Sequence, residues 1–294
     1  LPPAASGRAC PASRPAGTSP SRGLVWAIAR DVDPHPAPAN GATTVSVLLG
    51  NGPGGFPSSI EYAVGSYPES VTLGDFNRDG NPDLATANEM SNNISVLLGN
   101  GTGAFGPPTN FGFVLGPVSV TVCDFNLDGN PDLATANDSG SVSVLLCNGS
   151  GGFGTPTNFT VGVNPWSIIV ADLNRDGNPD LATANGGTND VSVLLGDGSG
   201  GFGAATNFPV GAFPFSVTVG DFNRDGNPDV ATANGVSNVS VLLGNGLGGF
   251  SAATNFPVGS YPEGVVVGDF NLDGNLDLAT ANEMSNNISV LLGN

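Results

Sequence analysis

The sequence contains no lysine, and its seven basic residues are all arginine. Against them stand 25 acidic residues, so the formal net charge is −18. Proteins that bind nucleic acid or anionic membrane surfaces need clustered cations that neutralise phosphates. The composition therefore excludes a protein that binds polyanions.

Histidine and cysteine are almost as scarce. The single histidine, His35, lies in a proline-rich stretch, so a serine protease triad, a cysteine–histidine pair and a histidine-based zinc site all lack their central residue. Three cysteines, Cys10, Cys123 and Cys147, are an odd and sparse set, which argues against a disulfide framework. We expect Cys123 and Cys147 on strands separated by a third strand, too far apart to bridge, where they act as small buried side chains.

Long apolar runs are missing as well. The longest run in the first forty residues, Leu24 to Ala29, is too short for a signal-peptide core or a membrane span. Residues 1–40 hold eight prolines and no periodic apolar pattern, and we interpret them as a proline-rich disordered leader. We expect no membrane insertion, and we assign residues 41–294 to the folded domain.

What the sequence does contain is a repeat. A segment of the type DFNRDGNPDLATAN occurs five times, with steps of 48 or 49 residues. The copies lie at 75–88, 124–137, 172–185, 221–234 and 269–282. A second phrase, Val or Ile followed by SVLL, occurs six times. With 45 Gly, 24 Pro and 39% apolar residues, the chain is rich in turns yet apolar enough to build a core.

Each unit contains about four short β-type runs, which in the first complete unit are 70–76, 84–88, 94–99 and 109–116. Four strands in a repeat of this length are typical of one propeller blade. We therefore predict an all-β protein, a β-propeller of four-stranded antiparallel blades. An Asn-Gly or Asp-Gly pair between the third and fourth runs predicts a tight hairpin.

The strand count leaves the number of blades open. From Thr43 onward the pattern gives 21 strands, whereas a five-bladed ring of four-stranded blades needs 20 and a six-bladed ring needs 24. The alternatives are five blades with closure by the N-terminal strand, or an incomplete six- or seven-bladed ring. In addition, residues 83–100 and 277–294 are identical.

The repeated segment begins with the nine-residue motif D-x-N-x-D-G-N-x-D, which places acidic or amide oxygens at positions one, three, five and nine. Calcium takes six to eight oxygen ligands, and a loop with ligands at every second residue wraps them around one point. Position seven supplies a backbone carbonyl, and glycine at position six permits the bend. For about five Ca²⁺ ions the predicted ligands are Asp75, Asn77, Asp79, Asn81, Asp83, Asp124, Asn126, Asp128, Asn130, Asp132, Asp172, Asn174, Asp176, Asn178, Asp180, Asp221, Asn223, Asp225, Asn227, Asp229, Asp269, Asn271, Asp273, Asn275 and Asp277.

Two other interpretations of these loops are possible. EF-hands place an acid at position twelve and a helix after it, but here position twelve is Thr and a β-type run follows, so an EF-hand is excluded. The other alternative is a turn rich in Asp and Asn that binds nothing. Three carboxylates at fixed offsets, repeated five times, would repel one another without a cation, which favours calcium. Position four is occupied by Arg78, Arg175 and Arg224 in three copies and by Leu in the others. One interpretation is that these arginines contact anions, but because they alternate with Leu we expect them to point to solvent.

Residues 43–294 resemble the FG-GAP/VCBS-type repeats, which are related to the calcium-bearing blades of the integrin α-subunit propeller. The resemblance rests on the calcium loop, the LATAN strand, the SVLLGNG hairpin and a Gly-Gly-Phe turn such as Gly54-Gly55-Phe56. It implies a propeller with calcium between the first two strands of a blade, and an extracellular binding or adhesion role. It implies no single activity, and this chain has too few repeats for a seven-bladed ring.

Because strand direction alternates within a blade, the calcium loops and the Asn-Gly hairpins belong to one face and the remaining loops to the other. The second face gathers aromatic residues next to Asn, Ser and Glu, the composition of a ligand-binding surface. The candidates are Tyr67, Trp166, Phe213 and Tyr261. The favoured alternative is that these rings wedge between blades, since each lies beside a proline at the same repeat position.

We expect a secreted or surface-exposed, monomeric propeller that serves as a non-catalytic binding or adhesion module for a protein or glycan, with calcium in a structural role. One alternative is a lectin-like propeller with a sugar site in each blade. A less favoured alternative is a glycosidase or lyase that uses carboxylates, since the repeats contain no His or Lys. Nearly all acids recur in every repeat, whereas an active site should break that symmetry, so no catalytic residue is expected.

Overall fold

The computed structural model describes residues 25–28, 43–50, 58–112 and 115–294, with only the backbone of residues 25–28. These residues contain 22 β-strands and no helix, so none of them forms a helix that could span a membrane. The described chain forms two compact units whose boundary lies within one strand, between Asn158 and Phe159.

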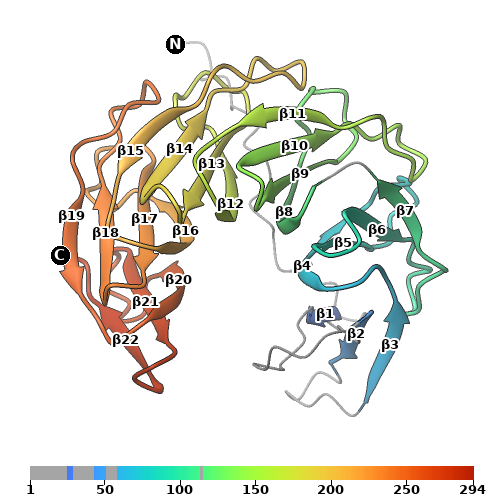
Figure 1. Cartoon of the computed structure of the whole chain (residues 1–294), viewed down its shortest axis with the longest axis horizontal. Helices are drawn as coiled ribbons and strands as arrows, with labels where there is room; N and C mark the ends of the chain where they lie inside the picture. Colours follow the sequence, from blue (N-terminus) through green and yellow to red (C-terminus); the bar gives the residue numbers. More distant parts are fainter. Residues whose placement is uncertain (1–24, 29–42, 51–57, 113–114) are drawn as a thin grey trace. The chain divides into compact units, whose positions relative to one another are not determined.

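The first unit contains sheets with the strand orders β1-β2-β3, β4-β5-β6-β7 and β8-β9-β10-β11 (Figure 1). The bounds are β1 Val25–Ile28, β2 Thr44–Leu49, β3 Ser59–Ala63, β4 Pro68–Gly74, β5 Asp83–Asn88, β6 Asn93–Leu97, β7 Thr109–Gly112, β8 Pro117–Cys123, β9 Asp132–Asn137, β10 Ser141–Leu145 and β11 Thr157–Thr160.

The second unit contains sheets with the orders β12-β13-β14-β15, β16-β17-β18-β19 and β20-β21-β22. The bounds are β12 Pro165–Ala171, β13 Asp180–Asn185, β14 Asp190–Leu194, β15 Thr206–Pro209, β16 Pro214–Gly220, β17 Asp229–Asn234, β18 Asn238–Leu242, β19 Thr254–Pro257, β20 Pro262–Gly268, β21 Asp277–Asn282 and β22 Asn287–Leu291.

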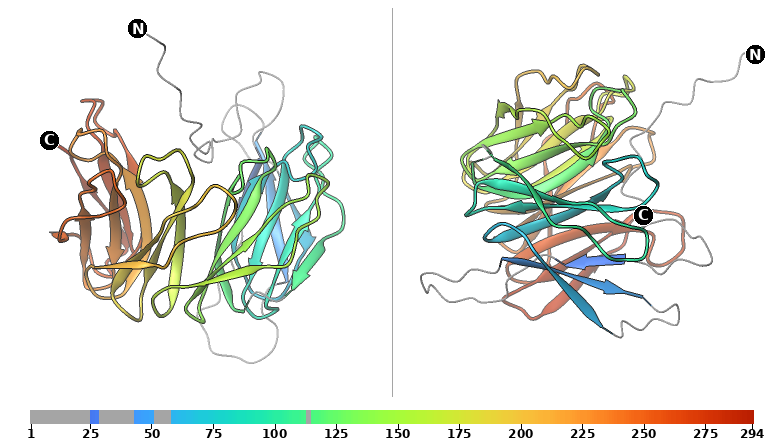
Figure 2. Two further views of the ribbon diagram at one scale, coloured as in Figure 1. Left: turned by 90° about the horizontal axis from the view of Figure 1, so that it is seen from above. Right: turned by 90° about the vertical axis from the view of Figure 1, so that its right-hand side faces the viewer.

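Neighbouring strands in each sheet run antiparallel, and the turned views of Figure 2 show the strands of one sheet side by side. In the second sheet, Leu84 of β5 pairs with Leu73 of β4 on one side and with Leu97 of β6 on the other. The prediction of an all-β chain built from repeated four-stranded antiparallel sheets is confirmed.

Strand β1 was not predicted. Val25–Ile28 belongs to the segment that we interpreted as a leader, yet it pairs with β2 in the place that a LATAN strand takes in the other sheets. Its sequence, VWAI, has the β-branched and aromatic residues that suit a strand, but it carries no repeat signal. The remainder of residues 1–40 lies outside the described residues.

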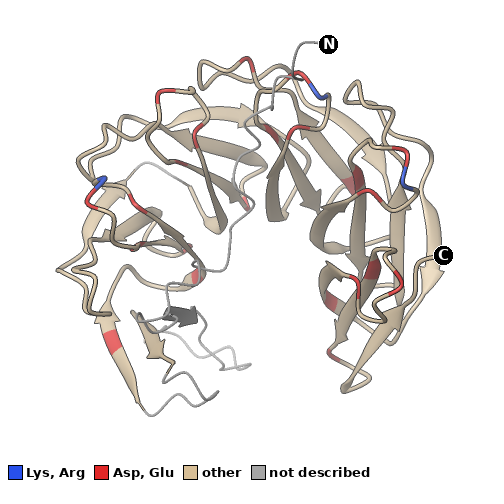
Figure 3. Ribbon diagram, turned by 180° about the vertical axis from the view of Figure 1, so that it is seen from behind, with Lys and Arg blue, Asp and Glu red and all other residues tan. Residues whose placement is uncertain are grey.

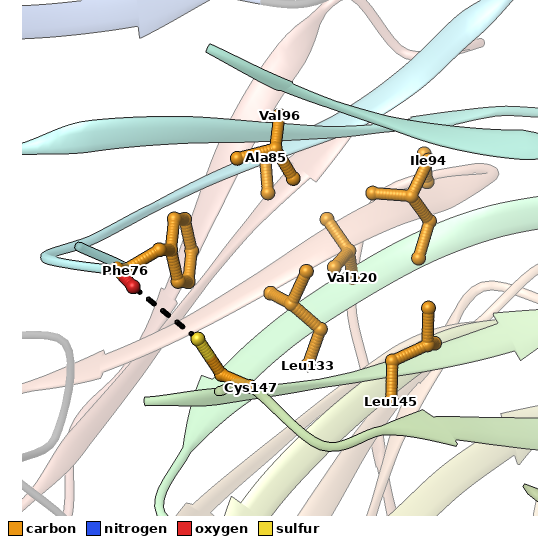
Figure 4. Packing of buried hydrophobic residues seen from close by; sticks show 9 residues of the cluster. Phe76, Ala85, Ile94, Val96, Val120, Leu133, Leu145 and Cys147 are labelled. Carbon is orange, nitrogen blue, oxygen red and sulfur yellow. Dashed lines mark hydrogen bonds between the residues drawn. The ribbon is translucent and has the colours of Figure 1, made fainter. Parts of the chain in front are cut away.

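The second strand of each complete sheet is buried along its whole length, as β5 shows. Its alanines leave room for the next sheet, so Ala85 and Ala87 share a core with Val120 and Leu133. Figure 4 shows this core from close by. The small side chains of the LATAN strand therefore allow close packing between sheets.

A ladder of polar side chains is buried inside each four-stranded sheet. In the second sheet, the Asn88 amide donates to Ser95 Oγ at 2.9 Å and accepts from Thr86 Oγ1 at 3.0 Å, and Ser95 donates to Asn110 at 2.7 Å. Thr86, Asn88 and Ser95 have no exposed surface. Because every buried polar group in the ladder has a partner, the ladder fixes the register of three strands, β5, β6 and β7, at once.

The two cysteines of the core differ from one another. Cys147 is free and buried, and its Sγ lies 3.3 Å from the carbonyl oxygen of Phe76 (Figure 4). The two described cysteines are not joined to each other, as expected. Cys123 is buried, as expected, but it is also disulfide-bonded, which the small and odd set of cysteines did not predict. No repeated feature of the sequence points to that bond.

The Asn-Gly hairpin prediction was partly wrong. The pair lies at the tip of a longer connection between β6 and β7, which is closed by a bridge between Gly99 and Phe105. Only Gly101 takes a positive φ, 77°, and the Asn100 side chain instead accepts the N–H of Thr102 at 3.0 Å. The equivalent Asn51-Gly52 pair and the Gly54-Gly55-Phe56 turn lie outside the described residues.

The last sheet, β20-β21-β22, exposes residues that the other sheets bury. Ile288 and Val290 are 73% and 47% exposed, whereas the matching Ile94 and Val96 are 0% and 1% exposed. The two pairs belong to the identical segments 277–294 and 83–100.

Candidate metal-binding loops

Each of the five candidate loops joins the first strand of a sheet to the second. In the first copy, position one, Asp75, directly follows β4, and position nine, Asp83, is the first residue of β5. All five loops therefore begin at the end of the first strand of a sheet and end at the start of the second strand. Figure 3 shows these acidic loops in red at the ends of the strands.

The carboxylate at position one folds the loop. Asp75 accepts the N–H of Asp79 at 3.0 Å and the N–H of Gly80 at 2.9 Å. All other copies repeat both bonds, at 2.8–3.1 Å. The bend needs left-handed backbone at position six, where Gly80 has φ 81°, and also at position four, where Arg78 has φ 59°.

The carboxylate at position five lies at the exposed tip. Asp79 accepts the N–H of Asn81 at 2.8 Å and the side-chain amide of Asn77 at 2.9 Å. These donors, with Asn81 the largest contribution, hold the pKa of Asp79 below its ordinary value. The group is therefore ionised at neutral pH and available to a cation.

The carboxylate at position nine is buried. Asp83 has no exposed surface, and it accepts the N–H of Phe76 and the N–H of Gly99, both at 2.8 Å. Burial raises the pKa of Asp83, against the opposing effect of the N–H donors. The negative charge of Asp79 adds to the increase.

The same effect is larger in two other loops. Burial raises the pKa of Asp132 and of Asp180 to about 6. For Asp132 the charges of Asp128 and Asp124 contribute to the increase. The carboxylates at positions one, five and nine of this loop thus lie within electrostatic reach of one another, and a cation would relieve their repulsion.

The donor set fits calcium in its chemistry. Every predicted donor is a carboxylate, amide or carbonyl oxygen, as a hard cation prefers. A carboxylate has about four acceptor sites, so the two N–H bonds at Asp83 leave capacity for a metal. Within the described ranges, no three His, Cys, Asp or Glu side chains form a ready-made metal cluster. Amide and carbonyl oxygens would therefore have to complete the coordination.

The hairpin between the third and fourth strands lies against the loop of its own sheet. A Cβ atom on Gly149 would lie 2.5 Å from Asn130 Oδ1, and one on Gly246 would lie 2.3 Å from Asn227 Oδ1. The hairpins and the candidate metal loops therefore share one face, as strand parity predicts.

The aromatic candidates lie at the opposite ends of the strands. Trp166 stacks on Phe215, with ring centroids 4.5 Å apart and an angle of 9° between the ring planes. Phe215 in turn contacts Tyr261 at 5.0 Å. These three partly buried rings pack against one another across successive sheets, the arrangement that the wedge interpretation describes.

Two further aromatic candidates adopt left-handed backbone. Phe213 has φ 56° and is 52% exposed, and the partly buried Tyr67 has φ 60°. The carbonyl of Phe213 accepts the N–H of Gly235 at 2.9 Å, so the unusual backbone serves a turn contact. The side chain of Phe213 is left in solvent.

Sequence reasoning missed the arginines at position four. Arg78 donates to Asn130 Oδ1 at 3.2 Å, and Arg175 donates to Asn227 Oδ1 at 3.1 Å. Both side chains are exposed, as expected, and each also reaches the loop of the next sheet. Both pairs are separated by 52 residues, which links position four of one loop to position seven of the next.

Comparison with known proteins identifies the repeat. The family model described as FG-GAP-like repeat matches residues 75–135, 124–183, 174–232 and 221–280. These matches together span more than half of the chain. A search of curated proteins found no match.

Solved structures share the fold at low sequence identity. A functionally unknown protein from Desulfotomaculum acetoxidans has a TM-score of 0.59 at 16% identity, covering 86% of this chain and 83% of its own. A structure of BBS1N in complex with ARL6DN has a TM-score of 0.57 at 13% identity, covering 87% and 73%. A putative 6-phosphogluconolactonase from Bacteroides uniformis has a TM-score of 0.57 at 13% identity, covering 85% and 78%.

Proposed function

This chain belongs to the family of FG-GAP-like repeat proteins, and from that premise we propose that it is a non-catalytic binding module of the β-propeller type, stabilised by calcium in its repeated loops. The observation that carries the proposal is the fivefold recurrence of one folded loop. In each copy the carboxylate at position one accepts the N–H groups of positions five and six.

Calcium would be held by the side-chain oxygens of positions one, three, five and nine and the carbonyl of position seven. In the second loop these residues are Asp124, Asn126, Asp128, Asp132 and Asn130. A bound ion would supply two positive charges that offset the repulsion among the carboxylates and tie the first strand of a sheet to the second. Asp132 contributes to that tie through its own N–H partners, Phe125 and Cys147.

The proposed role of calcium is structural because all five loops are alike and lie at strand ends. An ion used for one reaction would need one loop that differs from the rest. Fifteen of the 25 acids are the aspartates of these loops, so five Ca²⁺ ions would reduce the formal charge from −18 to −8. Loops of this kind match the roughly 0.1 to 1 mM affinities of extracellular modules, and we accordingly propose a secreted or surface-exposed protein.

Calorimetry of the full chain with and without a chelator tests this proposal. We expect the melting temperature to rise by several degrees on addition of 5 mM CaCl₂, since a ligand at about ten times its Kd stabilises by roughly 1.4 kcal/mol per site. MgCl₂ at the same concentration is the matched control, because Mg²⁺ demands a smaller octahedral site. An identical melting temperature in chelator and in CaCl₂ would refute the proposal.

The ligand of the module is proposed to bind on the face opposite the calcium loops. Phe213 is the exposed ring there, and Asn189 lies next to it, because its Oδ1 accepts the N–H of Phe213 at 2.8 Å. An exposed ring beside an amide suits a protein or a glycan ligand. A glycan array and a protein pull-down, each with wild type and Phe213→Asn, would separate these two, and binding unchanged by the substitution would exclude this face.

The number of blades and the closure of the ring are part of the same proposal. The sheets fit a monomeric propeller, either five-bladed with closure by a terminal strand or an incomplete six- or seven-bladed ring. A calcium-loaded experimental structure of the full chain would decide among these.

A further inference from the structure

Three of the candidate loops receive an arginine from the preceding sheet. Arg78 and Arg175 each donate to the position-seven asparagine of the next loop, at 3.2 and 3.1 Å. Arg224 donates to the position-six carbonyl, that of Gly274. In Figure 3 the arginines, in blue, lie within acidic loops drawn in red.

The stems of Arg78 and Arg175, although these residues are exposed, lie beside the hairpin of the next sheet. A Cβ atom on the hairpin glycine Gly149 would lie 3.4 Å from Arg78 Cδ, and one on Gly246 would lie 3.3 Å from Arg175 Cδ. At the guanidinium end, a Cβ atom on Gly129 would lie 3.7 Å from a nitrogen of Arg78. The aliphatic stem therefore lies beside the next hairpin, and the charge lies beside the bend of the next loop.

The guanidinium acts on the carboxylate at position five of that loop. Asn130 is the link, since it accepts from Arg78 and its own N–H donates to Asp128 at 2.8 Å. The positive charge of Arg78 is thus connected through Asn130 to Asp128, which is a predicted calcium ligand.

We propose that these arginines are positioning residues that set the calcium affinity of the next loop, each acting as an internal counter-ion that stabilises the metal-free loop and opposes the entry of Ca²⁺. The loops at 124–132, 221–229 and 269–277 then bind calcium more weakly than the loop at 172–180, whose preceding loop has Leu127 at position four. This inference rests on the proposed function, because it assigns a gradation to the same sites.

The natural repeats provide the test substitution. Leu127 and Leu272 occupy position four with φ 58° and 61°, almost the values of Arg78 and Arg224, both 59°. Replacing arginine by leucine therefore removes the charge and is compatible with the same left-handed backbone at position four. Asp and Asn ligands remain untouched.

The experiment is a CaCl₂ titration by isothermal calorimetry on the full chain, comparing wild type with Arg78→Leu, Arg175→Leu, Arg224→Leu and the triple variant. We expect about fivefold tighter binding at three sites in the triple variant, and at one site in each single variant, because one positive charge no longer repels the ion. Arg78→Lys, which keeps the charge, should bind as wild type does. Leu272→Arg adds a charge at position four of a loop with no later copy of the motif in the sequence, and it should leave the affinities unchanged.

Melting in chelator gives a second readout. The arginine variants should melt several degrees below wild type without calcium and within about one degree of it at saturating calcium. Unchanged affinities in the arginine variants, beside a wild type that binds calcium, would overturn this inference alone. A wild type that binds no calcium would overturn the proposed function and this inference with it.

Discussion

The buried carboxylate of Asp83 accepts the backbone N–H of Gly99 at 2.8 Å, and thereby joins the start of β5 to the residues that follow β6. Position nine of every other loop makes the same bond, at 2.7–2.8 Å. Position nine is therefore part of the sheet as well as part of a candidate metal loop, and its two roles can be separated by mutation.

We predict that Asp83→Asn destabilises the protein even in chelator, by about 2 kcal/mol, because an amide cannot accept both N–H groups and leaves one of them buried without a partner. The measurement is urea unfolding in EDTA. Asp79→Asn is the matched control, since position five is exposed, and it should change stability only when calcium is present. Equal losses for the two variants in EDTA would contradict this assignment.

The buried polar ladder should be costly to interrupt. Asn88→Ala removes the partner of Thr86 and of Ser95, so we expect a loss of about 3 kcal/mol in the free energy of unfolding. Thr86→Val preserves shape and leaves only one acceptor unused, and it should cost about 1 kcal/mol. If the two substitutions cost the same in denaturant melts, the ladder does not act as a unit.

Glu89 lies away from the candidate metal loops and gives a pH-dependent prediction. Burial, followed by the negative charges of Glu69 and Asp138, raises the pKa of Glu89. The folded state therefore holds this proton more tightly than the unfolded state, so the penalty of the charge is absent at low pH and appears as the pH rises through the pKa.

We accordingly expect Glu89→Gln to increase the free energy of unfolding at pH 7 by about 0.5 kcal/mol after allowance for solvent screening, and to have no effect near pH 3.5. Denaturant melts at the two pH values, in chelator throughout, make the comparison. A gain of the same size at both pH values would show that charge is not the cause.

Phe213 and Trp166 should respond in opposite ways. An aromatic residue in left-handed backbone is strained, and Asn164 takes the same backbone, φ 52°, at the equivalent position. Phe213→Asn should therefore leave stability unchanged or raise it by up to about 1 kcal/mol, while Trp166→Ala should cost about 3 kcal/mol through loss of its stack on Phe215. Thermal melts check both, and loss of stability in Phe213→Asn would give that ring a packing role instead.

The sheets could be predicted from the sequence because each strand signal recurs at a fixed step, so errors at one copy are corrected by the others. Strand β1 could not, since Val25–Ile28 has no copy and its place is decided by pairing with β2. The hairpin type was mispredicted for a local reason. The Asn100 side chain bonds the N–H of Thr102, an alternative to the left-handed backbone that Asn-Gly suggests.

For the candidate site, the sequence reveals donor types but not their partners. From the sequence alone, Asp83 is predicted to be a ligand in the same way as Asp75. Only the pairing of strands in the sheet brings the N–H of Gly99 to the Asp83 carboxylate. The reach of Arg78 to Asn130 likewise depends on how one sheet packs on the next. Contacts between repeats are thus harder to predict than contacts within them.

The identical segments 83–100 and 277–294 place one amino-acid sequence in two surroundings within a single molecule. Ile94 is covered by a neighbouring sheet, and Ile288, with the same residues on either side, faces solvent. Amide hydrogen exchange should therefore proceed at different rates in the two copies, and because propensity and local sequence cancel in the comparison, the ratio of the rates measures what a neighbouring sheet adds to local stability. The exposed copy, 277–294, therefore serves as an internal control for the covered copy, 83–100.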